Sequence, residues 1–166
     1  VGISIPDDFV FDGSRKQDNR IAYMPRRGYP CVRSCMRRNA SHDFAPIDGL
    51  SELEVARRLK SAGIFLATAV GEQFGLPALE AMAAGCLVIS VPVKGGMEFL
   101  DHGVNCLVAE PEKMPDALDR ILRTDYSKKR AMMRMKAVAT AQRYRVSIQR
   151  QRINSLLQNE LGWLRS

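Results

Sequence analysis

The sequence predicts an α/β fold in which a parallel sheet carries helices on both faces and a helical carboxyl-terminal tail follows. The first observation is that residues 64–70 and 86–93 are apolar runs of strand length, as expected for strands buried on both faces. The second is that a helical pattern lies between these runs and further helical patterns follow them. Alternation of buried strands with helices is typical of a parallel sheet.

The first strand is predicted at residues 20–25, a short apolar run that ends at Pro25 and leads into a loop at Arg26 and Arg27. A helix from Cys31 to Arg38 and a weaker strand within residues 42–50 are expected next.

Residues 51–63 carry the clearest helix signals of the chain. Ser51 can accept a hydrogen bond from the backbone at the start of the helix, and Glu54, three residues later, completes a capping box. Val55, Leu59 and Ala62 lie on one apolar face of this helix, and Gly63 is expected to end it.

The rest of the chain continues the alternation. The strand at 64–70 leads through a glycine-rich loop into a helix over 76–84, and the strand at 86–93 follows. The expected later elements are a short helix and turn within 95–103, a strand at 105–110, and helices at 113–123, 126–144 and 147–161. The last helix has an apolar side formed by Ile153, Leu156, Leu157 and Leu161. All 166 residues are therefore assigned to one domain, of which residues 126–166 are a helical tail.

Charge is distributed unevenly along the chain. The net charge is +7. Residues 126–166 hold ten basic residues and one acidic residue, whereas residues 1–125 hold 15 basic and 17 acidic residues. Such a tail suits an anionic membrane face or an acidic partner domain, and the alternative is a solvated helix face. Nucleic acid is not expected as a partner, because the tail has few interleaved aromatic residues. No apolar run approaches the ~20 residues that a membrane-spanning helix needs.

The four cysteines are Cys31, Cys35, Cys86 and Cys106, and they lack the paired spacing and nearby histidines of a zinc site. We expect them to be reduced thiols of the core, which makes the cytoplasm the default location. Contact of the basic tail with the inner face of the membrane is compatible with that location.

The segment GEQFGLPALE, residues 71–80, places two carboxylates around the start of the helix predicted at 76–84. Because this loop follows a buried strand, it lies at the carboxyl edge of the sheet, where open α/β folds bind ligands. Gly75 allows a close backbone approach, and Pro77 fits the first helical turn, so the helix start offers free amides that suit phosphate. Glu72 and Glu80 would repel phosphate but can accept hydrogen bonds from hydroxyl groups. A ribose at Glu80, a second polyol at Glu72 and a diphosphate between them outline a nucleotide sugar.

These residues also carry a family resemblance. EQFGLPALE at 72–80, followed by AMAAGCLVIS, by Gly95, Gly96 and Glu98, and then by GVNCLVAEP, resembles the carboxyl-terminal domain of the family 4 glycosyltransferases. The resemblance is dense from Ser51 to Pro111. It implies the Rossmann-like carboxyl-terminal half of a GT-B fold and the transfer of a sugar from a nucleotide donor to an acceptor, with retention of configuration.

The resemblance also implies roles for individual residues. Glu72 would contact the hydroxyls of the donor sugar in the catalytic site, and Glu80 would bind the ribose. The amides of Phe74, Gly75 and Leu76, ahead of Pro77, would hold the diphosphate. No metal and no cofactor are expected, because amides and basic side chains neutralise the diphosphate in that fold. The diphosphate is also expected to contact Arg26, with Arg27 as the alternate.

One departure from the family pattern concerns these basic residues. The family places an arginine shortly after the first strand and a lysine a few residues later, whereas here Arg26 and Arg27 are adjacent and the next lysine is Lys60.

The start of the chain resembles the segment that links the two halves of a GT-B enzyme, and it lacks an initiator methionine. We therefore expect a fragment that lacks its amino-terminal acceptor domain and is inactive on its own. The sequence does not predict which nucleotide base, which sugar or which acceptor is used. The alternative function is a non-catalytic nucleotide or nucleotide-sugar binding module, which a full-length gene without an upstream domain would favour.

Overall fold

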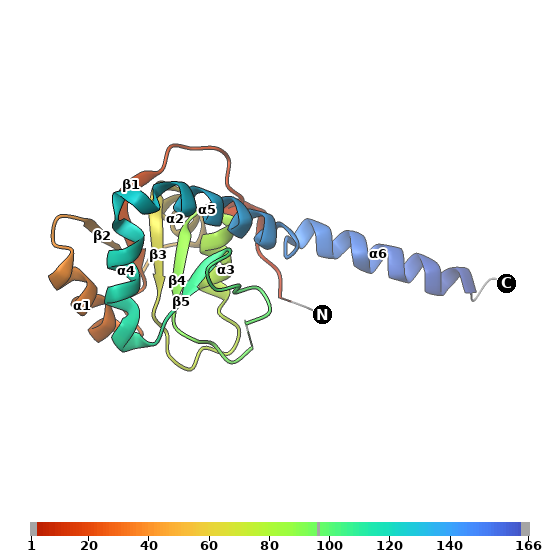
Figure 1. Ribbon diagram of the computed structural model, residues 1–166. Coiled ribbons are helices and arrows are strands. Elements are labelled where there is room, and N and C mark those ends of the chain that lie inside the picture. Colours follow the sequence, from red (N-terminus) through yellow and green to blue (C-terminus); the bar gives the residue numbers. More distant parts are fainter. Residues whose placement is uncertain (1–2, 96, 164–166) are drawn as a thin grey trace.

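The computed structural model describes residues 3–95 and 97–163, and the side chains as far as residue 158. A five-stranded parallel sheet, in the order β2-β1-β3-β4-β5, lies between two layers of helices (Figure 1). The predicted fold class is therefore confirmed. The strands are β1 Gln17–Tyr23, β2 Asp43–Pro46, β3 Ala62–Ala67, β4 Leu87–Ser90 and β5 Cys106–Val108.

Successive residues of the central strands point to opposite faces of the sheet, and each face has its own core. Phe65 and Val88 point to the face that is covered by α2 (Glu52–Ser61) and α3 (Leu76–Ala83). Ile64, Leu66 and their neighbours in β4 point to the other face, which is covered by α1 (Tyr29–Arg38) and α4 (Met114–Leu122). Full burial on both faces explains why these strands read as continuous apolar runs.

Helix α5 (Ser127–Gln142) joins the two layers at one end of the sheet. Its Met133 packs in the α1/α4 core, and its Ala137 and Ala141 pack in the α2/α3 core. Helix α6 (Val146–Trp163) then projects away from the domain, and its residues 150–158 are exposed (Figure 1). The apolar side predicted for this helix is thus exposed at Ile153, Leu156 and Leu157, while the side chain of Leu161 lies outside the described ones.

Three single-turn 3₁₀ helices complete the described elements: η1 Asp7–Phe9, η2 Pro111–Lys113 and η3 Thr124–Tyr126. Among the described residues, no helix is both long and apolar enough to cross a membrane.

The capping box predicted at Ser51 and Glu54 is confirmed, because the Ser51 amide donates to the Glu54 carboxylate at 2.9 Å and the Glu54 amide donates to the Ser51 hydroxyl. The predicted role of Gly63 is wrong, because α2 ends at Ser61 and Gly63 already belongs to β3. A Cβ on Gly63 would lie 2.9 Å from the Cα of Asp18 in β1. Close packing of the two strands, rather than a helix stop, requires this glycine.

Two further predictions differ from the structure. The strand predicted over 64–70 runs from Ala62 to Ala67, so the loop that follows it begins at Thr68. No helix forms in the described part of residues 95–103, where the chain turns instead. The Asn105 side chain holds this turn, since its amide donates to the Phe99 carbonyl and its oxygen accepts from the Asp101 amide. All four cysteines are free thiols, and Cys31 is only half-buried whereas the other three are buried.

Candidate functional site

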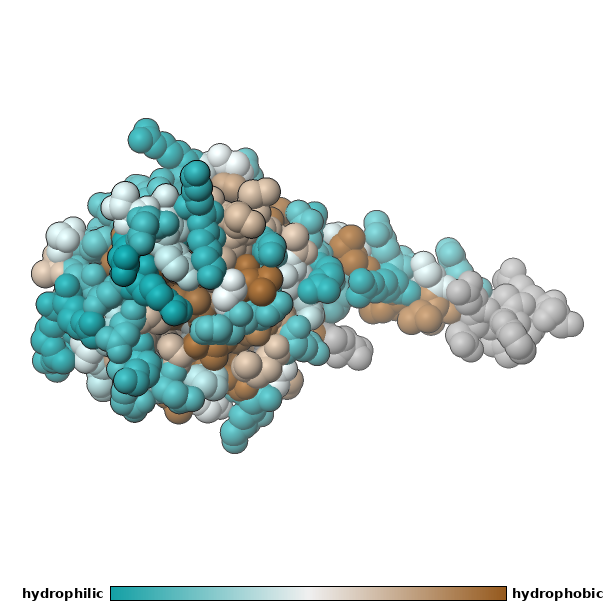
Figure 2. All heavy atoms as spheres, in the orientation of Figure 1, coloured by the Kyte–Doolittle hydropathy of each residue, from teal (hydrophilic) through white to brown (hydrophobic). Residues whose placement is uncertain are grey.

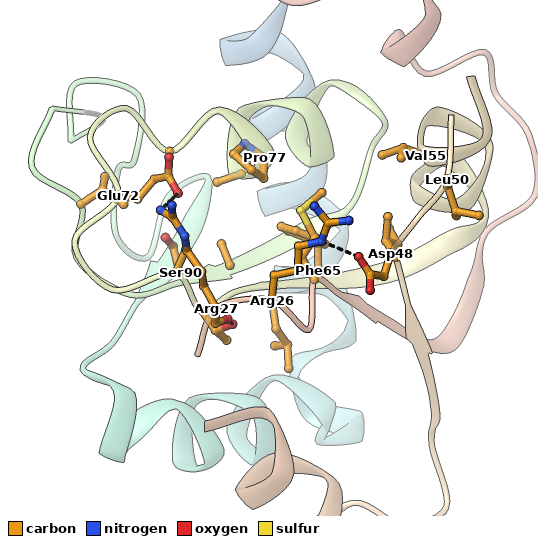
Figure 3. A pocket seen from close by; sticks show the side chains of 18 of the residues that line it. Arg26, Arg27, Asp48, Leu50, Val55, Phe65, Glu72, Pro77 and Ser90 are labelled. Carbon is orange, nitrogen blue, oxygen red and sulfur yellow. Dashed lines mark hydrogen bonds and ion pairs between the residues drawn. The ribbon is translucent and has the colours of Figure 1, made fainter. Parts of the chain in front are cut away.

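A pocket of about 380 Å³ opens at the carboxyl-terminal edge of the sheet, between the loops that follow β1, β2 and β3 (Figure 3). Its inner wall is apolar and is formed by the side chains of Met24, Ile47, Leu50, Val55 and Phe65. Its mouth is charged and is formed by Arg26, Arg27, Asp48 and Glu72. An apolar slot with a few convergent charges is the usual form of a small-molecule site.

The start of α3 forms one wall of this pocket. Gly75 is its N-cap residue with φ of +65°, a conformation that glycine adopts without strain, and Pro77 lies in the first turn. No described backbone group accepts a hydrogen bond from the amides of Phe74, Gly75 or Leu76. The helix therefore begins with unpaired N–H donors and the positive end of its dipole, an arrangement that suits an anion.

The side chains of Phe74 and Leu76 are exposed and do not line the pocket, whereas Gly75 and Pro77 do. A role for Phe74 and Leu76 through their amides, as predicted, is compatible with this placement. The loop itself is tied to the chain after β4, because the amides of Lys94 and Gly95 donate to the carbonyls of Glu72 and Gln73 at 3.1 and 2.7 Å.

Glu72 lies at the pocket mouth with about a quarter of its side chain exposed. The Arg27 guanidinium lies 3.8 Å from its carboxylate, and Figure 3 shows these two side chains pointing toward each other. Arg26 lies on the other side of the mouth, where its Nε donates to the Asp48 carboxylate at 2.6 Å. The structure thus brings both candidate arginines to one pocket and gives each a carboxylate partner.

Glu80 does not line the pocket. It lies one turn into α3 and is half-buried, and Glu52 in the first turn of α2 is close enough to influence it. Burial, and to a smaller extent the Glu52 charge, raise the pKa of Glu80 to about 7. A carboxyl group with this pKa can accept a hydrogen bond from a hydroxyl when it is ionised and can also donate one when it is protonated.

Gly28 and Thr68 were not predicted as site residues, although they hold two walls of the pocket together. Gly28 has φ of +75° and is the N-cap residue of α1, and a Cβ there would lie 2.7 Å from the Thr68 carbonyl carbon and closer still to its oxygen. The Thr68 hydroxyl donates to the Arg27 carbonyl at 2.9 Å. These contacts join the arginine loop to the loop that carries Glu72. The only sequence signal was a glycine three residues before the helix predicted at Cys31, a helix that begins at Tyr29 in the structure.

Among the residues that the structure describes, no group of three or more His, Cys, Asp and Glu side chains could hold a metal ion. The polar groups of the pocket include backbone amides, guanidinium groups, carboxylates and the residues Thr68 and Ser90, a set that suits a ligand with both anionic groups and hydroxyls.

Residues 38–140 match the sequence model of the family described as glycosyl transferases group 1. A stretch of 67 residues is 45% identical to an uncharacterized glycosyltransferase of Methanocaldococcus jannaschii, and it covers 38% of this chain and 17% of that protein.

Among solved structures, the chain is similar to the C-terminal domain of a glycosyl transferase group 1 family protein from Francisella tularensis. The TM-score is 0.69 and the identity 17%, over 83% of this chain and 96% of that one. It is also similar to the Anabaena protein HepE in complex with UDP, with a TM-score of 0.67 and 17% identity, over 86% of this chain and 49% of that one. The chain therefore spans about half the length of the Anabaena protein.

Proposed function

The chain belongs to the glycosyl transferases group 1 family, and we propose that it is the donor-binding half of a GT-B enzyme that transfers a sugar from a nucleotide diphosphate sugar to an acceptor. The observation that carries the proposal is the start of α3, where the amides of Phe74, Gly75 and Leu76 have no described backbone acceptor and Gly75 and Pro77 line a pocket with two arginines and Glu72 at its mouth. UDP in the similar Anabaena protein supports a nucleotide as the ligand.

In this proposal the diphosphate lies over the amides of Phe74, Gly75 and Leu76. Arg26 and Arg27 both lie at the mouth of the pocket, and either can bind the diphosphate. The diphosphate would then replace the carboxylate partner of that arginine. For Arg26 this exchanges a hydrogen bond to the Asp48 carboxylate for one to phosphate, whereas Arg27, 3.8 Å from the Glu72 carboxylate, would gain a hydrogen bond.

The reaction breaks the bond between the anomeric carbon and the diphosphate oxygen and forms a bond from that carbon to an acceptor hydroxyl oxygen. Negative charge develops on the departing diphosphate, where the helix start and an arginine stabilise it. No divalent cation is required for this step, because the amides and the guanidinium supply the positive charge. Glu72 orients the sugar through its hydroxyls, and the configuration at the anomeric carbon is retained. Glu80, which lies one turn into α3 and outside the pocket lining, binds the ribose where the nucleotide extends past the pocket.

We place the enzyme in the cytoplasm, where its four free thiols stay reduced. The acceptor and the residues that bind it belong to an amino-terminal domain outside these 166 residues.

The experiment that tests this function compares binding of a nucleotide sugar with binding of the free nucleoside diphosphate. Glu72→Ala is expected to weaken binding of a nucleotide sugar about tenfold and not to weaken binding of the free nucleoside diphosphate, because of the two ligands only the nucleotide sugar carries the hydroxyls that Glu72 binds. Calorimetric titration of both ligands measures the difference, and Glu112→Ala, which removes an exposed carboxylate away from the pocket, is the matched control. Equal losses for both ligands would support a nucleotide-binding module without a sugar site.

A further inference from the structure

Helix α5 presents a basic and apolar surface to solvent. We call it the α5 face and define it by Lys128, Lys129, Met132, Met135 and Lys136. All five residues are exposed, and the two methionines have exposed fractions of 59% and 73%. Their spacing of three and four residues places them on one side of the helix. The opposite side packs in the core through Met133, Ala137 and Ala141, and neither Met132 nor Met135 is among the described residues that pack against either core.

The charge of the α5 face is not neutralised by the rest of the described structure. None of its three lysines forms an ion pair with a described residue, and the sequence contains no acidic residue between Asp125 and Glu160. Lys129 lies 5.2 Å from the centre of the Tyr126 ring, a contact that leaves its charge at the surface.

Asp125 precedes the amino-terminal end of α5 and pairs with Arg123, and Asp18 pairs with Arg134 on the same helix. Other acidic neighbours lie toward the carboxyl-terminal end of the helix. Glu98 and Asp101 line a hollow there together with Lys136 and Arg143. At the amino-terminal end of α5, Lys128 and Lys129 follow Asp125 closely in the sequence but form no ion pair with any described residue, because Asp125 pairs with Arg123.

We propose that the α5 face docks the protein on a membrane surface that contains anionic phospholipids. Lysine ammonium groups reach phosphate headgroups while their aliphatic stems follow the helix, and the methionine side chains enter the boundary between headgroups and acyl chains. A face with positive charge alone would suit many polyanions. Two methionines exposed at its centre add apolar surface that a lipid boundary can cover, and this favours the membrane over nucleic acid.

The position of the face agrees with such a role. Arg134, on the same helix, donates to the Gly63 carbonyl at the start of β3 and pairs with Asp18 at the start of β1. The α5 face therefore lies at the amino-terminal edge of the sheet, whereas the pocket lies at the carboxyl-terminal edge. Figure 1 shows α5 at the opposite end of the sheet from the loops that follow β3 and β4, and Figure 2 shows hydrophilic side chains standing out beside paler, more apolar atoms at the end where α5 lies. Docking through α5 would leave the pocket open to donor.

The test is flotation of the full chain with vesicles of phosphatidylcholine alone and of phosphatidylcholine with about 30% phosphatidylglycerol. Wild type is expected to float only with the anionic vesicles and to be released at about 0.5 M salt, where the charges are screened. Lys128→Gln/Lys129→Gln should lower partitioning about 25-fold, since each surface charge contributes about fivefold. Met132→Ser/Met135→Ser should lower it about tenfold without changing the net charge.

The matched control is Arg150→Gln/Arg152→Gln, which removes the same charge from exposed positions of α6 and should change partitioning by less than about threefold. Thermal unfolding and nucleotide titration of each variant show that the fold and the pocket are intact. The proposal would be overturned if the control lost as much partitioning as the lysine variant, or if the methionine variant partitioned like wild type. It would also be overturned if wild type did not float with the anionic vesicles. Binding to a single-stranded oligonucleotide in place of vesicles would also overturn it.

Discussion

These 166 residues alone are expected to bind a nucleoside diphosphate and to transfer no sugar. In the proposed architecture the acceptor hydroxyl and the wall opposite the pocket come from the amino-terminal domain, so in this chain water reaches the pocket freely. Water would screen the charges that stabilise the departing diphosphate. The orientation of acceptor against donor, worth up to about 7 to 11 kcal/mol, would also be missing.

The measurement is a transfer and hydrolysis assay with nucleotide sugars of several bases, alongside binding of the matching nucleoside diphosphates. We expect binding and no turnover, and turnover only when the chain is joined to an amino-terminal acceptor domain. Efficient transfer by the isolated chain would contradict the assignment of the acceptor site to another domain.

Gly28→Ala is expected to destabilise the protein by at least about 3 kcal/mol. The left-handed conformation at φ of +75° costs an alanine about 1 to 2 kcal/mol. The added Cβ would also overlap the Thr68 carbonyl group, which is backbone and cannot rotate away. The two loops that carry Arg27 and Glu72 would have to separate.

Gly49→Ala is the matched control, because Gly49 has φ of +66° and a Cβ there would meet no atom within 4 Å. Gly49→Ala should lower the free energy of unfolding only by the cost of the left-handed backbone conformation, about 1 to 2 kcal/mol. Thermal unfolding compares the two, with about 2 to 4 °C expected for each kcal/mol in a chain of this size. An equal loss in both variants would show that the contact between Gly28 and Thr68 does not hold the loops together.

Local signals in the sequence predicted most of the fold. The capping box at Ser51 and the buried strand around Phe65 are each determined by a few neighbouring residues, so their patterns are visible without the fold. Gly63 was misread because a glycine after a helix has two explanations, a helix end or a close approach to another strand. Only the position of β1 decides between them.

The candidate site could be predicted in part for the same reason. Glu72, Gly75 and Pro77 lie within one short segment and share one pocket in the structure. The pairing of Arg26 with Asp48 and the contact of Gly28 with Thr68 join residues that are far apart along the chain, so no local pattern marks them. The position of Glu80 outside the pocket lining likewise depends on how α2 and α3 pack.

The most direct test of the donor site is calorimetric titration of UDP, GDP and ADP into the wild-type chain and Glu80→Ala. It is done at about pH 6 and about pH 8, on either side of the Glu80 pKa of about 7. One of the nucleotides should bind wild type about ten- to a hundredfold more tightly than it binds Glu80→Ala, because a charge-assisted hydrogen bond to the ribose is lost. The difference should be larger at the higher pH, where Glu80 is ionised and accepts that bond. Equal affinity of the two proteins at both pH values, or no binding of any of the three nucleotides, would contradict the proposed site.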